Sequence, residues 1–170
     1  MIGASGRAGS WIRTFTDQFS ERAEIVGLVD VNQEVLENQG HKLGLSKNQL
    51  FNDHQVAIDS VKADFCGIST PPQFHSSAAV LALNRGMPVI SEKPIADTLD
   101  SAKSMVKASV ETGLPCAIMQ NYRYARNKQE VIRIREEGRL GRLQHVFGRY
   151  ACDYREYLSW GRAWRHDMDF

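Results

Sequence analysis

Short apolar runs alternate with amphipathic segments along the first 120 residues. The apolar runs indicate strands at 24–31, 64–70, 87–91 and 115–120. The amphipathic segments carry apolar residues at helical spacing, and they predict helices over 7–19, 33–43, 56–61, 72–86 and 98–113. Strands that are apolar throughout are covered on both faces. The pattern therefore predicts an α/β fold with a doubly wound parallel sheet.

Two of these helices carry clear end signals. Pro72 suits the first turn of one helix and Gly86 its end, while Thr98 suits an N-cap and Gly113 the end of the next helix. The spacing of that second helix predicts an inward face made of Leu99, Ala102, Met105 and Val106.

The pattern changes after residue 121. A charged helix is predicted from Tyr124 to Glu137, and "LQHVFGRYACDY" at 143–154 then alternates with a period of two, which indicates a half-exposed antiparallel strand. We therefore expect a first domain over 1–121, and over 122–170 a linking helix and the first strand of a truncated α+β domain. Only Met1 and Ile2 precede the glycine turn, where a strand usually has about five residues, so we expect a fragment or a longer chain seen in part.

Composition and charge exclude several classes of function. The 170 residues are 42% apolar and 24% charged, which is typical of a globular protein. The net charge of +1 provides no overall attraction to nucleic acid or anionic lipid. The sequence contains neither a membrane-length apolar run nor a signal-peptide pattern, so a cytoplasmic protein is expected. Cys66, Cys116 and Cys152 lack the spacing of metal ligands, and we expect core residues and no metal site.

The stretch "GASGRAG" at 3–9 lies between a strand stub and a helix, the context in which a glycine-rich turn binds dinucleotides. Gly3 permits the tight turn, Gly6 lets a pyrophosphate approach the backbone, and Ala8 or Gly9 allows close helix packing. Ser5 stands where the commonest fingerprint has its second glycine, so the register of the motif is ambiguous. The N–H groups at the start of the following helix favour phosphate.

Asp30 closes the strand predicted over 24–31, which is the second strand if the stub at Met1–Ile2 is the first, some twenty residues beyond the glycine turn. A carboxylate there accepts hydrogen bonds from the ribose hydroxyls of NAD and repels the 2′-phosphate of NADP. NAD is therefore the predicted cofactor, with NADP possible. The alternatives are an ordinary strand-to-helix turn and an Asp30 that caps the next helix.

Four further stretches carry a family resemblance. "STPPQFH" at 69–75 and "SEKP" at 91–94, followed by "NYRY" and "GRLGRL", resemble the Gfo/Idh/MocA oxidoreductases over nearly the whole chain. The resemblance implies a Rossmann domain followed by a substrate and oligomerisation domain. It also implies hydride transfer between NAD(P) and a hydroxyl carbon of a sugar, inositol or related polyol, in an enzyme that is a homo-oligomer when complete.

The resemblance assigns roles to individual residues. Lys93 is the expected catalytic residue, where it would reach the substrate hydroxyl and stabilise charge as hydride leaves. The residues expected to bind the cofactor include those of the glycine turn and Asp30. The full set is Gly3, Ser5, Gly6, Arg7, Ala8, Asp30, Thr70, Pro71, Pro72, His75, Glu92, Lys93, Arg123, Trp164 and Arg165.

Other interpretations of these motifs stay open at this point. Glu92 and Lys93 could form a surface ion pair worth under about 1 kcal/mol. The family's catalytic histidine lies in a later motif that this sequence does not reach, and His166 and Asp167 come too early for it. A fragment without that histidine is expected to be inactive. The competing functions are a non-catalytic NAD-binding module or regulator and, less favoured, an imine reductase resembling dihydrodipicolinate reductase.

Overall fold

A computed structural model of the protein describes residues 1–149 and 151. The chain divides into two compact units, Met1–Tyr122 and Arg123–Phe170. Each unit is considered by itself below.

One parallel sheet forms the centre of the first unit. Its strands are β1 (Leu28–Val29), β2 (Leu50–Phe51), β3 (Cys66–Ile68), β4 (Val89–Ser91) and β5 (Cys116–Ile118). Ile2 makes parallel bridges to Val29 and to Ile68, so the strand stub at the N-terminus lies between β1 and β3. The spatial order is β2, β1, Ile2, β3, β4, β5.

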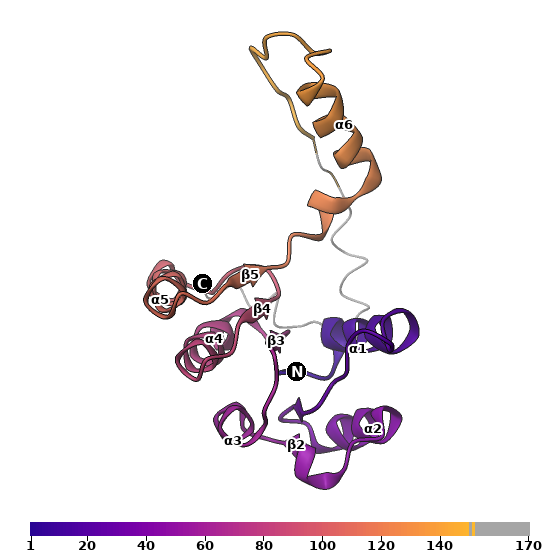
Figure 1. Cartoon of the computed structure of the whole chain (residues 1–170), viewed down its shortest axis with the longest axis vertical. Coiled ribbons are helices and arrows are strands. Elements are labelled where there is room, and N and C mark those ends of the chain that lie inside the picture. The colour runs from indigo at the N-terminus through magenta and orange to yellow at the C-terminus, as the bar shows by residue number, and fades with distance from the viewer. Residues whose placement is uncertain (150, 152–170) are drawn as a thin grey trace. The chain divides into compact units, whose positions relative to one another are not determined.

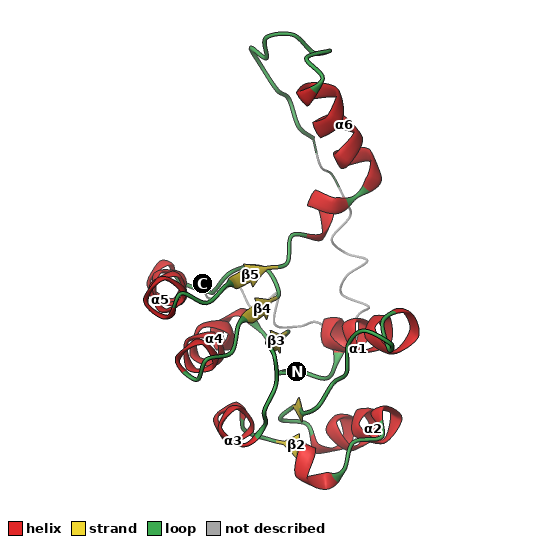
Figure 2. Ribbon diagram, viewed as in Figure 1, coloured by secondary structure: helices red, strands yellow, loops and turns green. Residues whose placement is uncertain are grey.

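Helices cover both faces of this sheet. They are α1 (Gly6–Gln18), α2 (Gln33–Leu43), α3 (His54–Ser60), α4 (His75–Asn84) and α5 (Leu99–Thr112), with short 3-10 turns at Lys47–Gln49 and Pro72–Phe74. Figures 1 and 2 show α1 and α2 on one side of the strands, and α3, α4 and α5 on the other. This arrangement confirms the predicted doubly wound parallel sheet.

Two hydrophobic clusters hold the layers together. The first contains Ala4, Ile12, Leu28 and Leu36, and it packs α1 and α2 against the sheet. The second lies under α3, α4 and α5, and its members include Ile2, Ile58, Cys66, Ile68, Leu83, Val89 and Met105. The central strands β1 and β3 are buried at every position, so they are apolar at consecutive positions, as the sequence pattern indicated.

The end signals of α5 are confirmed, but part of its predicted inward face is wrong. The Thr98 side chain accepts a hydrogen bond from the Ser101 N–H at 3.1 Å, and Gly113 ends the helix in the left-handed conformation. Leu99 is 70% exposed and Val106 54% exposed, whereas Met105 and Ala108 are buried. The buried stripe is therefore rotated from the predicted one, because α5 packs chiefly against α4.

The structure also differs from the sequence-based expectation at two places in the strands. β2 was not predicted, because Leu50 and Phe51 are only two residues between polar segments and pair with β1 through long-range contacts. Within residues 143–149 and 151 the structure contains no strand, where an antiparallel strand over 143–154 was expected. Residues 150 and 152–154 of that prediction lie outside the described residues.

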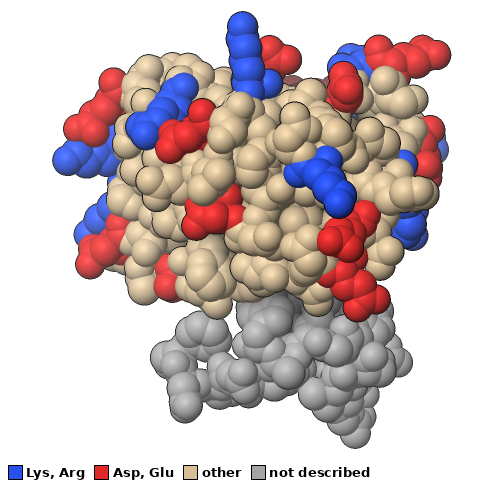
Figure 3. Space-filling model, turned by 90° about the horizontal axis from the view of Figure 1, so that it is seen from below, with Lys and Arg blue, Asp and Glu red and all other residues tan. Residues whose placement is uncertain are grey.

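The second unit contains α6 (Arg126–Glu136), whose side chains are all at least partly exposed. Arg133 forms ion pairs with Glu130 and Glu137 along this helix. None of the helices in the described part of the chain is long and apolar enough to cross a membrane. Acidic and basic side chains are interspersed on the face of the molecule shown in Figure 3, in line with the near-zero net charge.

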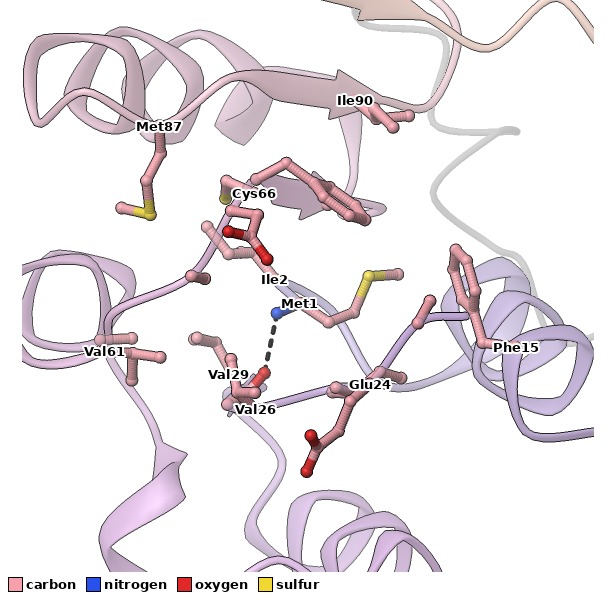
Figure 4. Close-up of a pocket in the computed structure, with 18 of the residues that line it drawn as sticks. Met1, Ile2, Phe15, Glu24, Val26, Val29, Val61, Cys66, Met87 and Ile90 are labelled. Carbon is pink, nitrogen blue, oxygen red and sulfur yellow. Dashed lines mark hydrogen bonds between the residues drawn. The ribbon is translucent and has the colours of Figure 1, made fainter. Parts of the chain in front are cut away.

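A cavity of about 490 Å³ lies beside Met1, between residues 24–27, which lead into β1, and residues 61–67, which lead into and begin β3 (Figure 4). The ammonium group of Met1 donates a hydrogen bond to the Gly27 carbonyl at 2.8 Å. Burial lowers the pKa of this amino group below its ordinary value. The cavity adjoins the residues that precede β1 and β3, whereas the predicted site residues follow the strands.

Candidate functional site

The candidate site lies where the carboxyl ends of the central strands meet. The stub at Ile2 is flanked by β1 on one side and β3 on the other, and the chain continues from these strands in opposite directions across the sheet. Such a topological switch point is where open α/β sheets bind their ligands. The turns that follow Ile2, β1, β3 and β4 carry most of the residues predicted from sequence.

Gly3 is required by the packing of the first turn. Its N–H donates to the Val29 carbonyl at 2.8 Å, and its φ is +95°. A Cβ atom at this position would lie 2.4 Å from the backbone oxygen of Ser69, so only glycine fits between the turn and the end of β3. Gly6 also has a positive φ, of +53°, but a Cβ atom added there would meet no heavy atom within 4 Å. The backbone at Gly6 is therefore open to a ligand.

The N-terminus of α1 follows this turn directly. Ser5 is the N-cap residue, and its side chain makes no capping hydrogen bond. The first N–H groups of the helix are thus not satisfied by the cap side chain, and they lie at the end of a helix dipole that favours anions. Ala8 is completely buried and packs the helix against the sheet, so its role is structural support of the turn.

Asp30 joins the end of β1 to the glycine turn. One carboxylate oxygen accepts the Ala4 N–H at 2.9 Å, and the other accepts the Asn32 N–H, also at 2.9 Å. The side-chain amide of Asn52 donates to the Asp30 carbonyl at 3.0 Å. The cap of α2 is Asn32, not Asp30, because the Asn32 side chain accepts the Val35 N–H. A carboxylate oxygen accepts more than one hydrogen bond, so capacity for ribose hydroxyls remains.

Glu92 is the most deeply buried acidic residue of the site, at 5% exposure. Its Oε2 accepts the Lys93 N–H at 3.0 Å, and its Oε1 lies 3.2 Å from Nε of Arg7 in α1. That ion pair is not aligned as a hydrogen bond, so Oε1 remains a buried oxygen without a hydrogen-bond partner among the described residues. The pair links the glycine turn to the end of β4, and no local sequence pattern indicated this contact.

Lys93 differs from its neighbour in being exposed. Among residues 1–149 and 151, its ammonium group forms no ion pair with Glu92 or with any other carboxylate within 4.0 Å. The alternative of a Glu92–Lys93 surface ion pair is therefore wrong. The buried Glu92 side chain holds the backbone of the turn through the Lys93 N–H, whereas the Lys93 side chain is exposed.

The turn after β3 contributes Thr70, Pro71 and Pro72, all of them half-buried. The hydroxyl oxygen of Thr70 is buried and has no hydrogen-bond partner among the described residues. His75, which begins α4, is completely buried. Both of its ring nitrogens contact backbone carbonyls, one of Thr70 and one of Pro94, so the ring supports the turns and does not line the cleft.

Three of the predicted cofactor residues are not placed at this edge by the structure. Arg123 begins the second unit, in the 3-10 turn Asn121–Tyr124, and is exposed. Trp164 and Arg165 lie outside the described residues. In the described part of the chain, no group of three or more His, Cys, Asp or Glu side chains could hold a metal ion.

Sequence reasoning missed several residues that shape the site. Asn32 and Asn52 hold the Asp30 backbone and the start of α2, and the Ser69 carbonyl sets the space at Gly3. Asn32, two residues after a strand-ending aspartate, could have been interpreted as an N-cap. The contact between Gly3 and the Ser69 carbonyl depends on how the sheet is assembled, and no pattern of neighbouring residues indicated it.

The two cysteines in the described chain do not belong to the site. Cys66 is buried in β3 and Cys116 is half-buried in β5, and burial raises the pKa of both thiols. A raised pKa keeps a thiol protonated and unreactive. The prediction of core cysteines is confirmed for Cys66, while Cys152 lies outside the described residues.

These observations fit a dinucleotide. The open backbone at Gly6 and the uncapped start of α1 match a pyrophosphate, and the Asp30 carboxylate matches a ribose. The unpartnered oxygens of Thr70 and Glu92 are polar groups whose hydrogen bonds a ligand at this edge could complete.

Comparisons with known proteins agree with a dinucleotide-binding fold. A family model described as an oxidoreductase family with an NAD-binding Rossmann fold matches residues 1–120. The protein y4oX of Sinorhizobium fredii is 37% identical over 98% of this chain and 47% of its own length. D-apiose dehydrogenase of Paraburkholderia graminis is 34% identical over 70% of this chain and 31% of its own length. The chain thus spans less than half the length of these relatives.

Solved structures show the same architecture. The WlbA dehydrogenase of Bordetella pertussis, in complex with NADH and UDP-GlcNAcA, has a TM-score of 0.76 at 29% identity, covering 83% of this chain and 42% of that one. The scyllo-inositol dehydrogenase of Lactobacillus casei, with bound NAD(H) and scyllo-inositol, has a TM-score of 0.76 at 19% identity, covering 82% and 41%, and supports the fold alone. The match over residues 1–120 and the glycine turn, Asp30 and "SEKP" at one sheet edge identify this chain as a member of the Gfo/Idh/MocA family of NAD-binding oxidoreductases.

Proposed function

We propose that this chain is the NAD-binding part of a dehydrogenase that moves hydride between NAD and a hydroxyl-bearing carbon of a sugar, inositol or related polyol. The observation that carries the proposal is Lys93, exposed beside the buried Glu92 at the carboxyl edge of the sheet. The name of one relative supports the substrate class, because it is a D-apiose dehydrogenase.

The cofactor half of the site is formed by three groups. Asp30 would accept the ribose hydroxyls, and its charge would disfavour the 2′-phosphate of NADP. The open backbone at Gly6 and the start of α1, with Ser5, would hold the pyrophosphate. Arg7, which is half exposed, would add positive charge at the same helix end.

Lys93 has the properties that alcohol oxidation requires. The hydroxyl loses its proton to a base, and the carbon gives up hydride to the cofactor. The oxygen carries negative charge after the proton has left and until hydride transfer turns the alkoxide into a carbonyl. Bound NAD supplies the hydride acceptor. An ammonium group that is already in place stabilises the oxygen without reorganisation, which is the most effective form of electrostatic catalysis. The Glu92 carboxylate fixes the Lys93 backbone through the Lys93 N–H, and Pro94 restricts Lys93 to extended angles.

The 170-residue chain by itself is expected to bind NAD without turnover. It spans less than half the length of the relatives that it matches. The family resemblance places the acid–base histidine and most substrate contacts in the part of those proteins that follows the Rossmann domain. The predicted homo-oligomer and cytoplasmic location stay predictions.

Isothermal titration calorimetry of the chain with NAD, NADH and NADP tests the proposal. We expect binding of NAD and NADH, and weaker binding of NADP. Lys93→Met should leave the affinity for NAD within about threefold of the parent, because the contact that we propose for Lys93 is with the substrate oxygen.

The matched control is Lys103→Met, which removes an exposed lysine from α5. Absence of binding to all three nucleotides would disprove the cofactor site. Loss of NAD affinity in Lys93→Met alone would make Lys93 a cofactor ligand. Turnover of a polyol by Lys93→Met at the parent rate, in a chain that carries the substrate domain, would rule out its catalytic role, since removing one such donor typically costs about 10² to 10³ in rate.

A further inference from the structure

His75 is a buried ionisable residue that the proposed mechanism does not use. It is the first residue of α4, and its side chain is completely buried. Nδ1 lies 2.9 Å from the Pro94 carbonyl oxygen, and Nε2 lies 2.9 Å from the Thr70 carbonyl oxygen. Both ends of the ring are therefore engaged by the backbone.

The two carbonyls belong to the turn that follows β3 and to the turn that carries Lys93. The proposed contact of Lys93 with the oxygen on the reacting carbon puts this pair of turns at the nicotinamide end of the cofactor, since hydride passes between that carbon and the nicotinamide. Thr70 follows β3, and Pro94 follows Lys93 at the end of β4. The strands β3 and β4 are adjacent and parallel, and the Glu92 N–H donates to the Ile68 carbonyl at 2.8 Å. The imidazole ring thus joins the turn that contains Thr70 to the turn that contains Lys93.

The chemistry of the contacts explains why a histidine suits this position. A carbonyl oxygen only accepts hydrogen bonds. A neutral imidazole donates to one of the two carbonyls, and a doubly protonated ring donates to both. No ring nitrogen remains for a ligand, and the complete burial of the side chain excludes direct contact with a bound nucleotide.

We propose that His75 is a positioning residue for the nicotinamide half of the cofactor site. It acts by holding the Thr70 turn and the Lys93 turn at a fixed separation, and it touches neither cofactor nor substrate. This role rests on the proposed function, because it concerns the geometry of the proposed NAD site. It differs from a general contribution to stability, since the adenosine half of the site is built from Gly6 and Asp30 on other turns.

The first experiment compares NAD with ADP-ribose, which contains the adenosine and pyrophosphate but lacks nicotinamide. In the 170-residue chain, His75→Phe keeps a ring and removes both nitrogens. We expect the affinity for NAD to fall about tenfold, a loss of roughly 1.4 kcal/mol, while the affinity for ADP-ribose stays within about twofold. His75→Asn and His75→Gln, which return an amide toward Pro94 or Thr70, should recover part of the NAD affinity.

The second experiment needs no ligand. Amide hydrogen exchange of the free chain should be faster in His75→Phe at the Glu92 and Lys93 N–H groups, and unchanged in α2. The control is His41→Gln, which alters an exposed histidine in α2 and should change neither measurement.

The outcomes separate this inference from the proposed function. Equal loss of affinity for NAD and ADP-ribose, or unchanged affinity for both, would overturn the positioning role. Unchanged exchange at Glu92 and Lys93 would also overturn it. Failure of the parent chain to bind either nucleotide would instead refute the proposed function, and the exchange result would still decide whether His75 holds the two turns.

Discussion

Gly3 and Gly6 are both glycines with a positive φ, but they differ in how closely other atoms approach them. An added Cβ at Gly3 meets the Ser69 carbonyl at 2.4 Å, whereas at Gly6 it meets nothing within 4 Å. Gly3→Ala should therefore reduce the free energy of unfolding by about 3 kcal/mol or more, through strain and a backbone clash. Gly6→Ala should cost only about 1 to 2 kcal/mol.

Urea denaturation of both variants, followed by NAD titration, measures these effects. Gly6→Ala is expected to weaken NAD binding at temperatures where the variant is fully folded, because the new methyl group occupies the open space at the turn. Equal destabilisation by the two substitutions would show that the Ser69 carbonyl does not prevent a side chain at position 3.

Asp30 sets the expected preference for NAD over NADP. Its carboxylate also holds the Ala4 N–H, so its removal affects the turn as well as the charge. Asp30→Asn keeps the size of the side chain and removes the charge. The ratio of NADP to NAD affinity should rise about tenfold, or roughly 1.4 kcal/mol, because the repulsion of the 2′-phosphate is removed.

Parallel calorimetric titrations with the two nucleotides provide the measurement for Asp30. Asp64→Asn, a change at an aspartate just before β3, is the control for net charge. A ratio that does not change in Asp30→Asn would exclude a role for Asp30 in cofactor choice.

At the scale of elements, the amino group of Met1 is buried in the 170-residue chain. Burial lowers the pKa of this group in the folded state, while the unfolded chain keeps an ordinary value of about 8. Just below pH 8 the unfolded state therefore binds more protons than the folded state. The free energy of unfolding should rise as the pH approaches 8, by at most about 1.4 kcal/mol per pH unit.

Chemical denaturation at a series of pH values tests this prediction by comparison with the N-terminally acetylated chain. The range from about pH 6 to about pH 9 covers the titration of an ordinary amino group. Acetylation removes the titrating group, so the difference in unfolding free energy between the two forms should vary with pH. Parallel pH profiles would mean that the amino group is not buried in solution.

At the scale of the whole molecule, the first unit should be independent of the second. Among residues 1–149 and 151, neither hydrophobic cluster extends beyond Ile118, and no side chain of α6 is buried. A chain of residues 1–122 should therefore unfold within about 1 kcal/mol of the 170-residue chain. It should also keep its affinity for NAD, since Gly6, Asp30 and Glu92 all lie within it.

Circular dichroism during urea unfolding and NAD titration of the 1–122 chain are the relevant measurements. A 1–122 chain that fails to fold, or that loses NAD affinity while folded, would show that residues 123–170 contribute to the first unit. Arg123 would then be the first residue to restore.

The sequence by itself determined the parallel α/β fold, the glycine turn, Asp30 at the carboxyl end of the strand after that turn, and the caps of α5. These features are encoded locally, since strand burial, turn conformation and capping depend on residues within a few positions of each other. Only the tertiary structure decided the contacts that give the site its shape. The Arg7–Glu92 pair, the contact of His75 with the Pro94 carbonyl and the pairing of β2 with β1 join segments distant in sequence. Such contacts depend on how the sheet brings distant turns together. A pattern of neighbouring residues contains no information on which distant turns will meet.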